Sequence, residues 1–278
     1  MTTELAFVTP EPDRRHDAGP FDIVSDVHGC TDELEALLGR LGYRVTFSGR
    51  PRRAVVTAPK GRRAFFVGDL VDRGPRSPDA LRIVMAMVAS GQAYCVAGNH
   101  DDKFRRWLLG HDVVISHGIE TTIAQFAAED DAFKAEVVAF LTSLPHHAWL
   151  DGGRLAVAHA GIRADMIGRV NDRIRRFCLY GDADGSVDAN GLAVRYHWAA
   201  HYRGETAIVY GHTPIDTPAW FNNTLCIDTG CCFGGAMSAL RWPEREIVTE
   251  PARAVYAERK RAFGHPPVRP PRETPERS

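Results

Sequence analysis

Short apolar runs alternate with stretches of helical periodicity along the first 110 residues. The runs FDIVS, AFFVG and AYCVAG have the length and residue types of buried strands. They precede TDELEALLGRLG, SPDALRIVMAMVAS and DDKFRRWLLG, in which apolar side chains recur at helical spacing. Thr31 and Ser77 are expected to cap the first two helices, with Pro78 in the first turn of the second. The alternation predicts a largely parallel sheet flanked by helices.

The rest of the chain adds a helical segment and more strands. Helical patterning continues from about Gly118 to Leu144, and AWLDGGRLAVAH predicts a hairpin that turns at Asp151 and Gly152. The final third contains the strand-like runs TAIVYGH, TLCIDTG, AMSALRW and EIVTEP. Two mixed β-sheets packed face to face and flanked by helices accommodate all of these elements, so the predicted fold class is α/β.

Composition sets the domain organisation. Residues 1–20 are rich in Pro, Asp and Arg and predict a flexible N-terminal arm, while residues 261–278 predict a disordered Pro/Arg-rich tail. The segment between them, residues 21–260, shows no linker or internal repeat. A chain of 278 residues is near the upper size of a single domain, and we expect one domain here.

The bulk numbers are those of an ordinary soluble protein: 44% hydrophobic, 25% charged and a net charge of -1. This charge gives no field that would attract nucleic acid or an acidic membrane. No apolar run approaches transmembrane length, and the N-terminus lacks a signal-peptide pattern. The six cysteines form no CxxC motif, which is typical of reduced cytoplasmic thiols. We do not expect Cys231 and Cys232 to share an ion, because neighbouring cysteines seldom converge on one.

Six of the apolar runs end in the side chains that bind metals. Ligands of α/β sheets bind beyond the carboxyl ends of the strands, so these side chains are expected to meet there. Carboxylate oxygens, imidazole nitrogens and an amide oxygen, with no thiolate among them, suit two divalent ions. We expect manganese, with iron, nickel or zinc as alternatives. The residues are Asp26, His28, Asp69, Asn99, His100, His159, His212 and Asp228.

The ordered motifs SDVHG, GDLVDRG, GNHD, HAG and GHT resemble the phosphoprotein-phosphatase branch of the calcineurin-like metallophosphoesterases. The resemblance spans roughly residues 21–251. The stretches AGNHDDKFRRWLLG, VRYHWAAHYRGETAIVYGHTP and IDTGCCFGGAMSALRWPERE are most similar to the phosphatase module of bacterial polynucleotide kinase-phosphatases. They also resemble the bis(5'-nucleosyl)-tetraphosphatase-like enzymes.

The resemblance implies a role for each site residue. It implies that Asp69 is shared by two metal sites, the first completed by Asp26 and His28 and the second by Asn99, His159 and His212. It further implies that His100 lies beside the leaving group and that Asp72 orients His100. Arg73 would bind the substrate phosphate, and Asp228 would be a further catalytic residue.

Two features bear on the substrate. The chain has no GxxxxGK[ST] phosphate loop and hence no P-loop kinase module, which leaves a part in RNA repair open. Asp101 follows Gly-Asn-His where animal-type protein phosphatases usually carry Glu, which disfavours a protein substrate. Ser25 replaces the Gly that is usual in the first motif, a small-for-small change.

The expected function is metal-dependent hydrolysis of phosphomonoesters. The expected partners are a phosphorylated small molecule, a nucleotide, or an RNA end bearing a 2',3'-cyclic or 3' phosphate, and no membrane. Three alternatives stay open: hydrolysis of dinucleoside tetraphosphates, dephosphorylation of Ser/Thr in proteins, and a non-catalytic metal- or phosphate-binding module. The complete set of ligand residues disfavours the last, because a degenerate member would have lost some of them.

Overall fold

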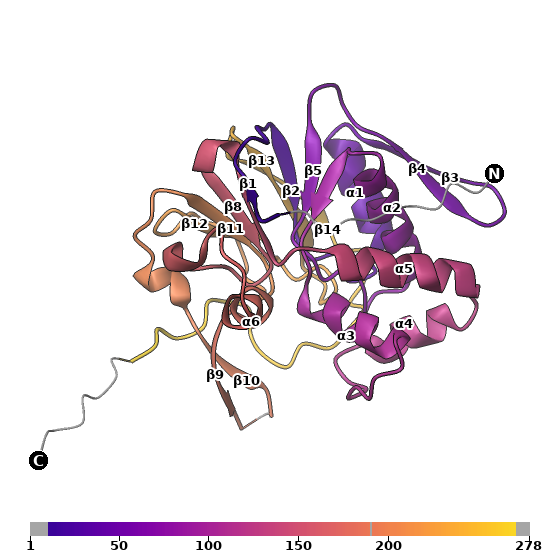
Figure 1. The fold of residues 1–278 in the computed structure, drawn as a ribbon. Coiled ribbons are helices and arrows are strands. Elements are labelled where there is room, and N and C mark those ends of the chain that lie inside the picture. Colours follow the sequence, from indigo (N-terminus) through magenta and orange to yellow (C-terminus); the bar gives the residue numbers. More distant parts are fainter. Residues whose placement is uncertain (1–10, 190, 271–278) are drawn as a thin grey trace, which may run out of the picture.

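The computed structural model describes residues 11–189 and 191–270. Two five-stranded mixed sheets pack face to face, as the sequence predicts (Figure 1). The order in the first sheet is β14-β13-β2-β5-β6, and the order in the second is β1-β7-β8-β11-β12. The first sheet consists of β2 (Phe21–Val24), β5 (Arg63–Phe66), β6 (Ala93–Cys95), β13 (Ala236–Trp242) and β14 (Glu246–Pro251). The second consists of β1 (Asp13–Arg14), β7 (His147–Leu150), β8 (Leu155–Ala158), β11 (Ala207–Tyr210) and β12 (Thr224–Cys226).

Each sheet has a parallel centre. In the first sheet β2, β5 and β6 run parallel, and β13 and β14 complete it in antiparallel pairing. In the second sheet β8, β11 and β12 run parallel, and β7 forms the predicted hairpin with β8 through the 3-10 turn Asp151–Gly153. The parallel strands of both sheets therefore present their carboxyl ends together, which is the geometry that builds a site.

Apolar side chains from both sheets fill the space between them. Ile23 and Phe65 of the first sheet pack with Val157 and Val209 of the second, and all four are buried. Burial on this face accounts for the apolar character of the strand runs, since a parallel strand covered on both faces exposes no polar side.

Helices cover the outer faces of the sheets (Figure 1). They are α1 (Thr31–Arg40), α2 (Ser77–Ala89), α3 (Asn99–Leu108), α4 (Ile119–Phe126), α5 (Asp131–Ser143) and α6 (Asp172–Tyr180). The first five contribute to the core cluster on the outer face of the first sheet, and α6 packs on the second sheet with Trp198. Two small hairpins that the sequence analysis does not predict are β3 (Arg44–Ser48) with β4 (Arg53–Thr57) and β9 (Asp182–Val187) with β10 (Ala193–Tyr196).

The predicted helix caps are wrong in detail. The helices α1 and α2 begin at Thr31 and Ser77, so the capping positions fall one residue earlier. The Thr31 hydroxyl donates to the Arg76 carbonyl (2.7 Å), and the Ser77 hydroxyl lies 3.1 Å from that of Thr122. Both side chains thus bind across the fold rather than to their own helix. Pro78 does lie in the first turn of α2, as predicted.

The described parts of the two terminal segments contact the domain. Of the predicted N-terminal arm, residues 13 and 14 form β1 and pair with β7. Of the predicted tail, Arg261 pairs with Asp188 (2.5 Å) and Arg269 with Asp182 (2.6 Å). Residues 1–10 and 271–278 lie outside the described residues. Within the described ranges, no helix has both the length and the apolar character needed to cross a membrane.

Candidate metal centre and active site

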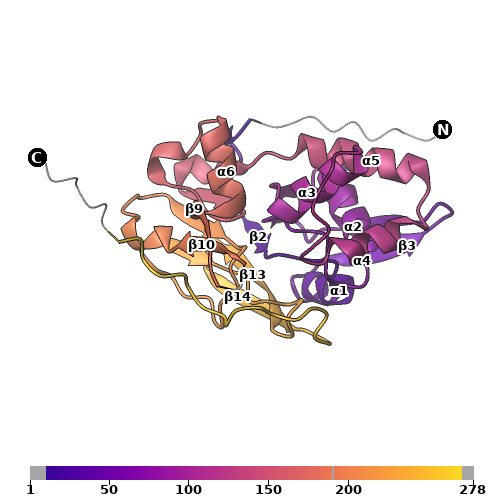
Figure 2. The ribbon, with the colours of Figure 1, turned by 90° about the horizontal axis from the view of Figure 1, so that it is seen from below.

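The strand-end residues meet at one edge of the two sheets. Figure 2 views the molecule from the side on which α3, α6 and the β9–β10 hairpin lie around this edge. The first sheet supplies the residues that follow β2, β5 and β6, and the second supplies those that follow β8, β11 and β12. They are Asp26, His28, Asp69, Asn99 and His100 from the first sheet, and His159, His212 and Asp228 from the second. The structure brings these residues to the same edge, and most of them contact one another.

Several site residues have left-handed backbone conformations. His28, Asp69, Asp72, Arg73 and His212 have φ values of 46°, 51°, 76°, 70° and 72°. Non-glycine residues adopt this region at a cost and usually only where the surrounding structure enforces it. The sharp turns point these side chains back across the strand ends toward one another.

Two glycines allow the loops to touch. A Cβ atom on Gly98 would overlap the backbone nitrogen and Oδ1 of Asp69, and one on Gly211 would overlap Oδ2 of Asp26. The loops that follow β5 and β6, and those that follow β2 and β11, are therefore in direct contact. No side chain fits between these segments.

One group of ligand atoms surrounds His159. Its Nε2 lies 2.9 Å from Nδ1 of His212, 3.1 Å from Oδ1 of Asn99 and 3.4 Å from Oδ1 of Asp69. Its Nδ1 lies 3.1 Å from the Val67 carbonyl, to which it donates a hydrogen bond. That bond fixes the tautomer and leaves the lone pair of Nε2 facing the group, as in histidines that bind metals.

A second group lies on the other side of Asp69. The Nδ1 of His28 donates to the Val71 carbonyl at 2.9 Å, so its Nε2 lone pair faces Oδ2 of Asp69 at 3.5 Å. Asp69 therefore presents one oxygen to each group, the arrangement of a bridging carboxylate. Asp26 lies nearer to the first group, with its oxygens 3.1 and 3.2 Å from the backbone nitrogen of His212.

The electrostatics of these groups favour bound cations. Burial and the charges of Asp228 and Asp69 raise the pKa of Asp26 well above its usual value. Burial likewise raises the pKa of Asp69 to about 7 and that of Asp228 to about 6. The Nε2 of His212 is buried with no hydrogen-bond partner among the described residues. Buried carboxylates are costly unless paired or bound to metals, and cations between these groups would neutralise them, so the donor set fits two divalent ions.

His100 and Asp72 form a hydrogen-bonded pair. The Nδ1 of His100 lies 2.6 Å from Oδ2 of Asp72, and both side chains are buried. Burial raises the pKa of Asp72 to about 8, while burial and the Arg73 charge lower the pKa of His100 well below its usual value. Burial therefore disfavours the charged form of both groups.

The Arg73 guanidinium lies against both imidazoles. Its Nη1 is 2.6 Å from Nε2 of His28, and its Nη2 is 3.0 Å from Nε2 of His100. The guanidinium also lies over the Phe233 ring, 4.9 Å from its centroid. Arg73 thus touches the atoms that a metal or a phosphate would engage.

Two further residues of the site are not found by the sequence analysis. Asp101 accepts hydrogen bonds from the backbone nitrogens of Leu70 (2.9 Å) and Gly98 (3.0 Å), and so ties the loops after β5 and β6 together. Its signal in the sequence is the acid at the third position of a helix that follows Gly98, a capping position. Arg195 of β10 lies near enough to Asp69 for their charges to interact, and its Nε is buried with no partner in the described part of the chain. Nothing in the local sequence marks it.

Positive charge gathers around His117. Burial and the charges of Lys103, Arg73, Lys260 and Arg195 all lower its pKa. These cations lie near Asp69 and Asp72, whose charges act on Arg195 and Lys103. Cationic side chains thus lie around a centre of buried carboxylates.

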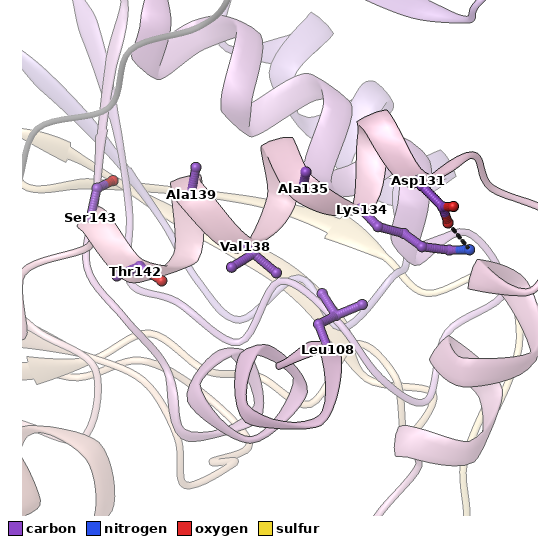
Figure 3. A pocket seen from close by; sticks show the side chains of 8 residues that line it. All are labelled: Leu108, Asp131, Lys134, Ala135, Val138, Ala139, Thr142 and Ser143. Atoms are coloured by element: carbon purple, nitrogen blue, oxygen red, sulfur yellow. Dashed lines mark hydrogen bonds and ion pairs between the residues drawn. The ribbon is translucent and has the colours of Figure 1, made fainter. Parts of the chain in front are cut away.

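A surface hollow of about 700 Å³ lies elsewhere, along α5 and the end of α3 (Figure 3). It shares no lining residue with the strand-end group. Its lining consists of Leu108, Asp131, Lys134, Ala135, Val138, Ala139, Thr142 and Ser143. Without a histidine or more than one carboxylate, it does not offer the chemistry of the strand-end centre.

Comparison with known proteins agrees with this centre. Residues 19–235 match the family model described as calcineurin-like phosphoesterase. The chain belongs to the calcineurin-like phosphoesterase family. The family and fold class that the sequence predicts are thereby confirmed, and the protein is a metal-dependent phosphoric ester hydrolase.

Relatives match this phosphoesterase along nearly their whole length. The bis(5'-nucleosyl)-tetraphosphatase PrpE [asymmetrical] of Anoxybacillus flavithermus is 44% identical over 248 residues, which are 87% of this chain and 99% of that protein. The protein of the same name from Geobacillus thermodenitrificans is 45% identical over 235 residues, covering 83% of this chain and 94% of its own. The crystal structure of a proposed diadenosine tetraphosphatase is 24% identical, with a TM-score of 0.60 over 89% of this chain and 98% of its own, and supports the fold.

Replacement of Gly98 by alanine tests the contact between the loops. Gly98 has a φ of -90°, which alanine adopts without strain, so Gly98→Ala adds only the clash with Asp69. We expect the variant to melt at a lower temperature and to bind less metal, because the added Cβ must displace the backbone and the carboxylate of Asp69. Gly39→Ala is the matched control, since a Cβ there meets nothing within 4 Å. The measurement is metal content by elemental analysis. Normal metal content in Gly98→Ala would contradict the close contact between the loops that follow β5 and β6.

Proposed function

We propose that this phosphoesterase hydrolyses bis(5'-nucleosyl) tetraphosphates, releasing a nucleoside monophosphate and a nucleoside triphosphate. The observation that carries the proposal is the similarity to relatives of that name over nearly their entire length. The sequence analysis puts phosphomonoester hydrolysis first and this reaction second, and we put this reaction first because of that similarity.

The charges around the site support a polyphosphate substrate. A tetraphosphate chain carries a negative charge on each phosphate, so it needs cations beyond those at the reacting phosphorus. Lys103, Lys260 and Arg195 lie around His117 and provide them.

The grouping of the donor atoms supports the metal roles that the resemblance implies, except that Asp26 lies nearer to His159 and His212 than to His28. We assign Asp69 as the bridge, with Asp26 and His28 completing the first site and Asn99, His159 and His212 the second. Two bound ions would supply Lewis-acid activation of water and of the phosphate oxygens. Oxygen and imidazole ligands without a thiolate favour manganese, and iron, nickel and zinc are the alternatives.

Arg73 binds the reacting phosphate in this proposal. Its guanidinium contacts the Nε2 of His28, the atom assigned to the first ion, so it must leave that position when the site is loaded. Its planar fork can then meet two phosphate oxygens and stabilise the charge that builds on them. Asp228 accepts a hydrogen bond from the backbone nitrogen of Gly230 at 2.9 Å, and its charge raises the pKa of Asp26 and adds to the negative charge that the ions would neutralise.

His100 acts as the general acid. The cationic imidazole donates its Nε2 proton to the departing oxygen, and the Asp72 carboxylate, hydrogen-bonded at Nδ1, stabilises the cationic ring before transfer. A nucleotide leaving group is only weakly basic, so the acid contributes less to this reaction than to hydrolysis of an alkyl phosphate.

A substrate panel tests the proposed reaction. Chelated protein should be inactive, and manganese should restore activity best. The reconstituted enzyme should show its highest kcat/KM on a dinucleoside tetraphosphate, with mono- and triphosphate products separated by chromatography. The other substrates are an aryl phosphate, a nucleoside 2',3'-cyclic phosphate, a nucleoside 3'-phosphate and a phosphopeptide. A higher kcat/KM on any of these would overturn the substrate, and activity that survives complete metal removal would overturn the metal centre.

Esters of graded leaving-group pKa test His100. We expect His100→Asn to slow alkyl phosphate hydrolysis by roughly 10²–10⁴-fold, because an alkoxide needs the proton. Hydrolysis of nitrophenyl phosphate, whose leaving group is stable as an anion, should fall much less. The measurement is kcat/KM along the series at unchanged metal content. Equal losses across the series would exclude the acid role.

Arg195 is tested against a surface arginine. Arg195→Met removes a half-buried cation whose Nε has no hydrogen-bond partner among the described residues, and we expect kcat/KM on the tetraphosphate to fall by about 10- to 100-fold, as on loss of one hydrogen bond to a charged group. Arg163→Met is the control, because Arg163 pairs with the exposed Asp165 (3.2 Å). A fall in the control as large as that in Arg195→Met would contradict a specific role.

A further inference from the structure

A second cluster of metal-binding side chains lies apart from the catalytic residues. Cys30, Glu33 and Cys231 each bring one ligand atom to within 4.8 Å of the other two. Their exposed fractions are 0%, 0% and 3%, so the cluster is enclosed. It joins the turn after β2, the first turn of α1 and the loop after β12, segments that are 200 residues apart in the chain.

The Glu33 carboxylate is only half satisfied. One oxygen accepts hydrogen bonds from the backbone nitrogen of Arg253 and from the Tyr256 hydroxyl, both at 2.8 Å. The other oxygen is buried and has no hydrogen-bond partner in the described ranges. A buried carboxylate is costly unless it is paired or binds a metal, so the bare oxygen indicates a missing cation. The two donors hold the carboxylate in place, as second-layer hydrogen bonds hold metal ligands.

Two cysteines complete this cluster of metal-binding side chains. The Cys30 thiol donates to the His28 carbonyl at 3.6 Å, and the Cys231 sulfur belongs to the same cluster of ligand atoms. Cys232 points elsewhere, with its sulfur 3.8 Å from Nη1 of Arg73. The two adjacent cysteines therefore do not converge, as the sequence predicts, and Cys231 meets Cys30 instead.

This set of donors suits a different ion from those of the catalytic centre. Two thiolates and a carboxylate favour Zn²⁺, which binds sulfur at about 2.3 Å in a tetrahedron, with sulfur atoms about 3.8 Å apart. The observed spacing requires only a small contraction. The catalytic donors include no sulfur, so the two sites differ in softness and would select different ions from a mixture. A water molecule or a peptide carbonyl would fill the fourth position.

We propose that Cys30, Glu33 and Cys231 bind a structural zinc ion, in addition to the ions of the catalytic centre. The ion links the loop that carries His28 to the loop that carries Asp228. Through Glu33 it also holds the segment with Arg253 and Tyr256. It stabilises the rear of the active site without touching the substrate, and the inference does not depend on which phosphate ester is hydrolysed.

Cobalt substitution tests the proposal directly. The full chain, purified with reductant, is stripped of metal, loaded with Co²⁺ and examined by absorption spectroscopy. The wild type should show thiolate-to-cobalt charge transfer in the near ultraviolet. Cys30→Ser and Cys231→Ser should lose it, whereas Cys178→Ser, which removes a buried thiol of α6, should keep it. Absence of the band from the wild type, or its persistence in both cluster variants, overturns the proposal.

Zinc content and stability give a second readout. The wild type should retain one tightly held zinc ion per chain after a mild chelator has removed the catalytic ions. Glu33→Gln should release that ion and melt at a lower temperature, and added zinc should raise the melting temperature of the wild type but not of the variant. A Cys30–Cys231 disulfide in place of the ion would contradict the site. So would equal zinc retention in Glu33→Gln and the wild type.

Discussion

The site depends on the burial of negative charge where two sheets meet. Asp26, Asp69 and Asp228 lie almost out of contact with water, and each raises the cost of ionising another. Only cations make such a cluster stable as carboxylates, and Asp69 offers an oxygen to each of two imidazole groups. The left-handed turns, the glycines without room for a Cβ and the backbone bonds of Asp101 all keep these oxygens in place.

The two-sheet architecture explains why ligands so far apart in the chain meet. Parallel strands at the centre of each sheet end at the same edge, and the apolar layer between the sheets sets the spacing of the two edges. His28 and His159 come from different sheets, and each donates its Nδ1 proton to a carbonyl beside the loops of the first sheet, at Val71 and Val67. Packing thus fixes both the positions and the tautomers of the ligands.

The sequence predicts the strand ends because strands and ligands follow a local pattern, an apolar run that stops at Asp, His or Asn. The same reasoning fails for contacts that tertiary structure decides. Thr31 and Ser77 look like helix caps but bind residues on other segments. Arg195 reaches the centre from a hairpin whose polar sequence gives no strand signal, and Cys30 and Cys231 meet across 200 residues. Such partners are set by the fold as a whole.

The central claim is that Asp69 bridges two ions, and electron paramagnetic resonance of the manganese-loaded enzyme tests it most directly. Two Mn²⁺ ions that share a carboxylate are magnetically coupled, so the account predicts the many-line spectrum of a coupled pair at two catalytic manganese ions per chain. The coupled signal should disappear in Asp69→Asn while manganese can still occupy the site of His159 and His212. A wild-type spectrum of isolated manganese at full loading would contradict the account.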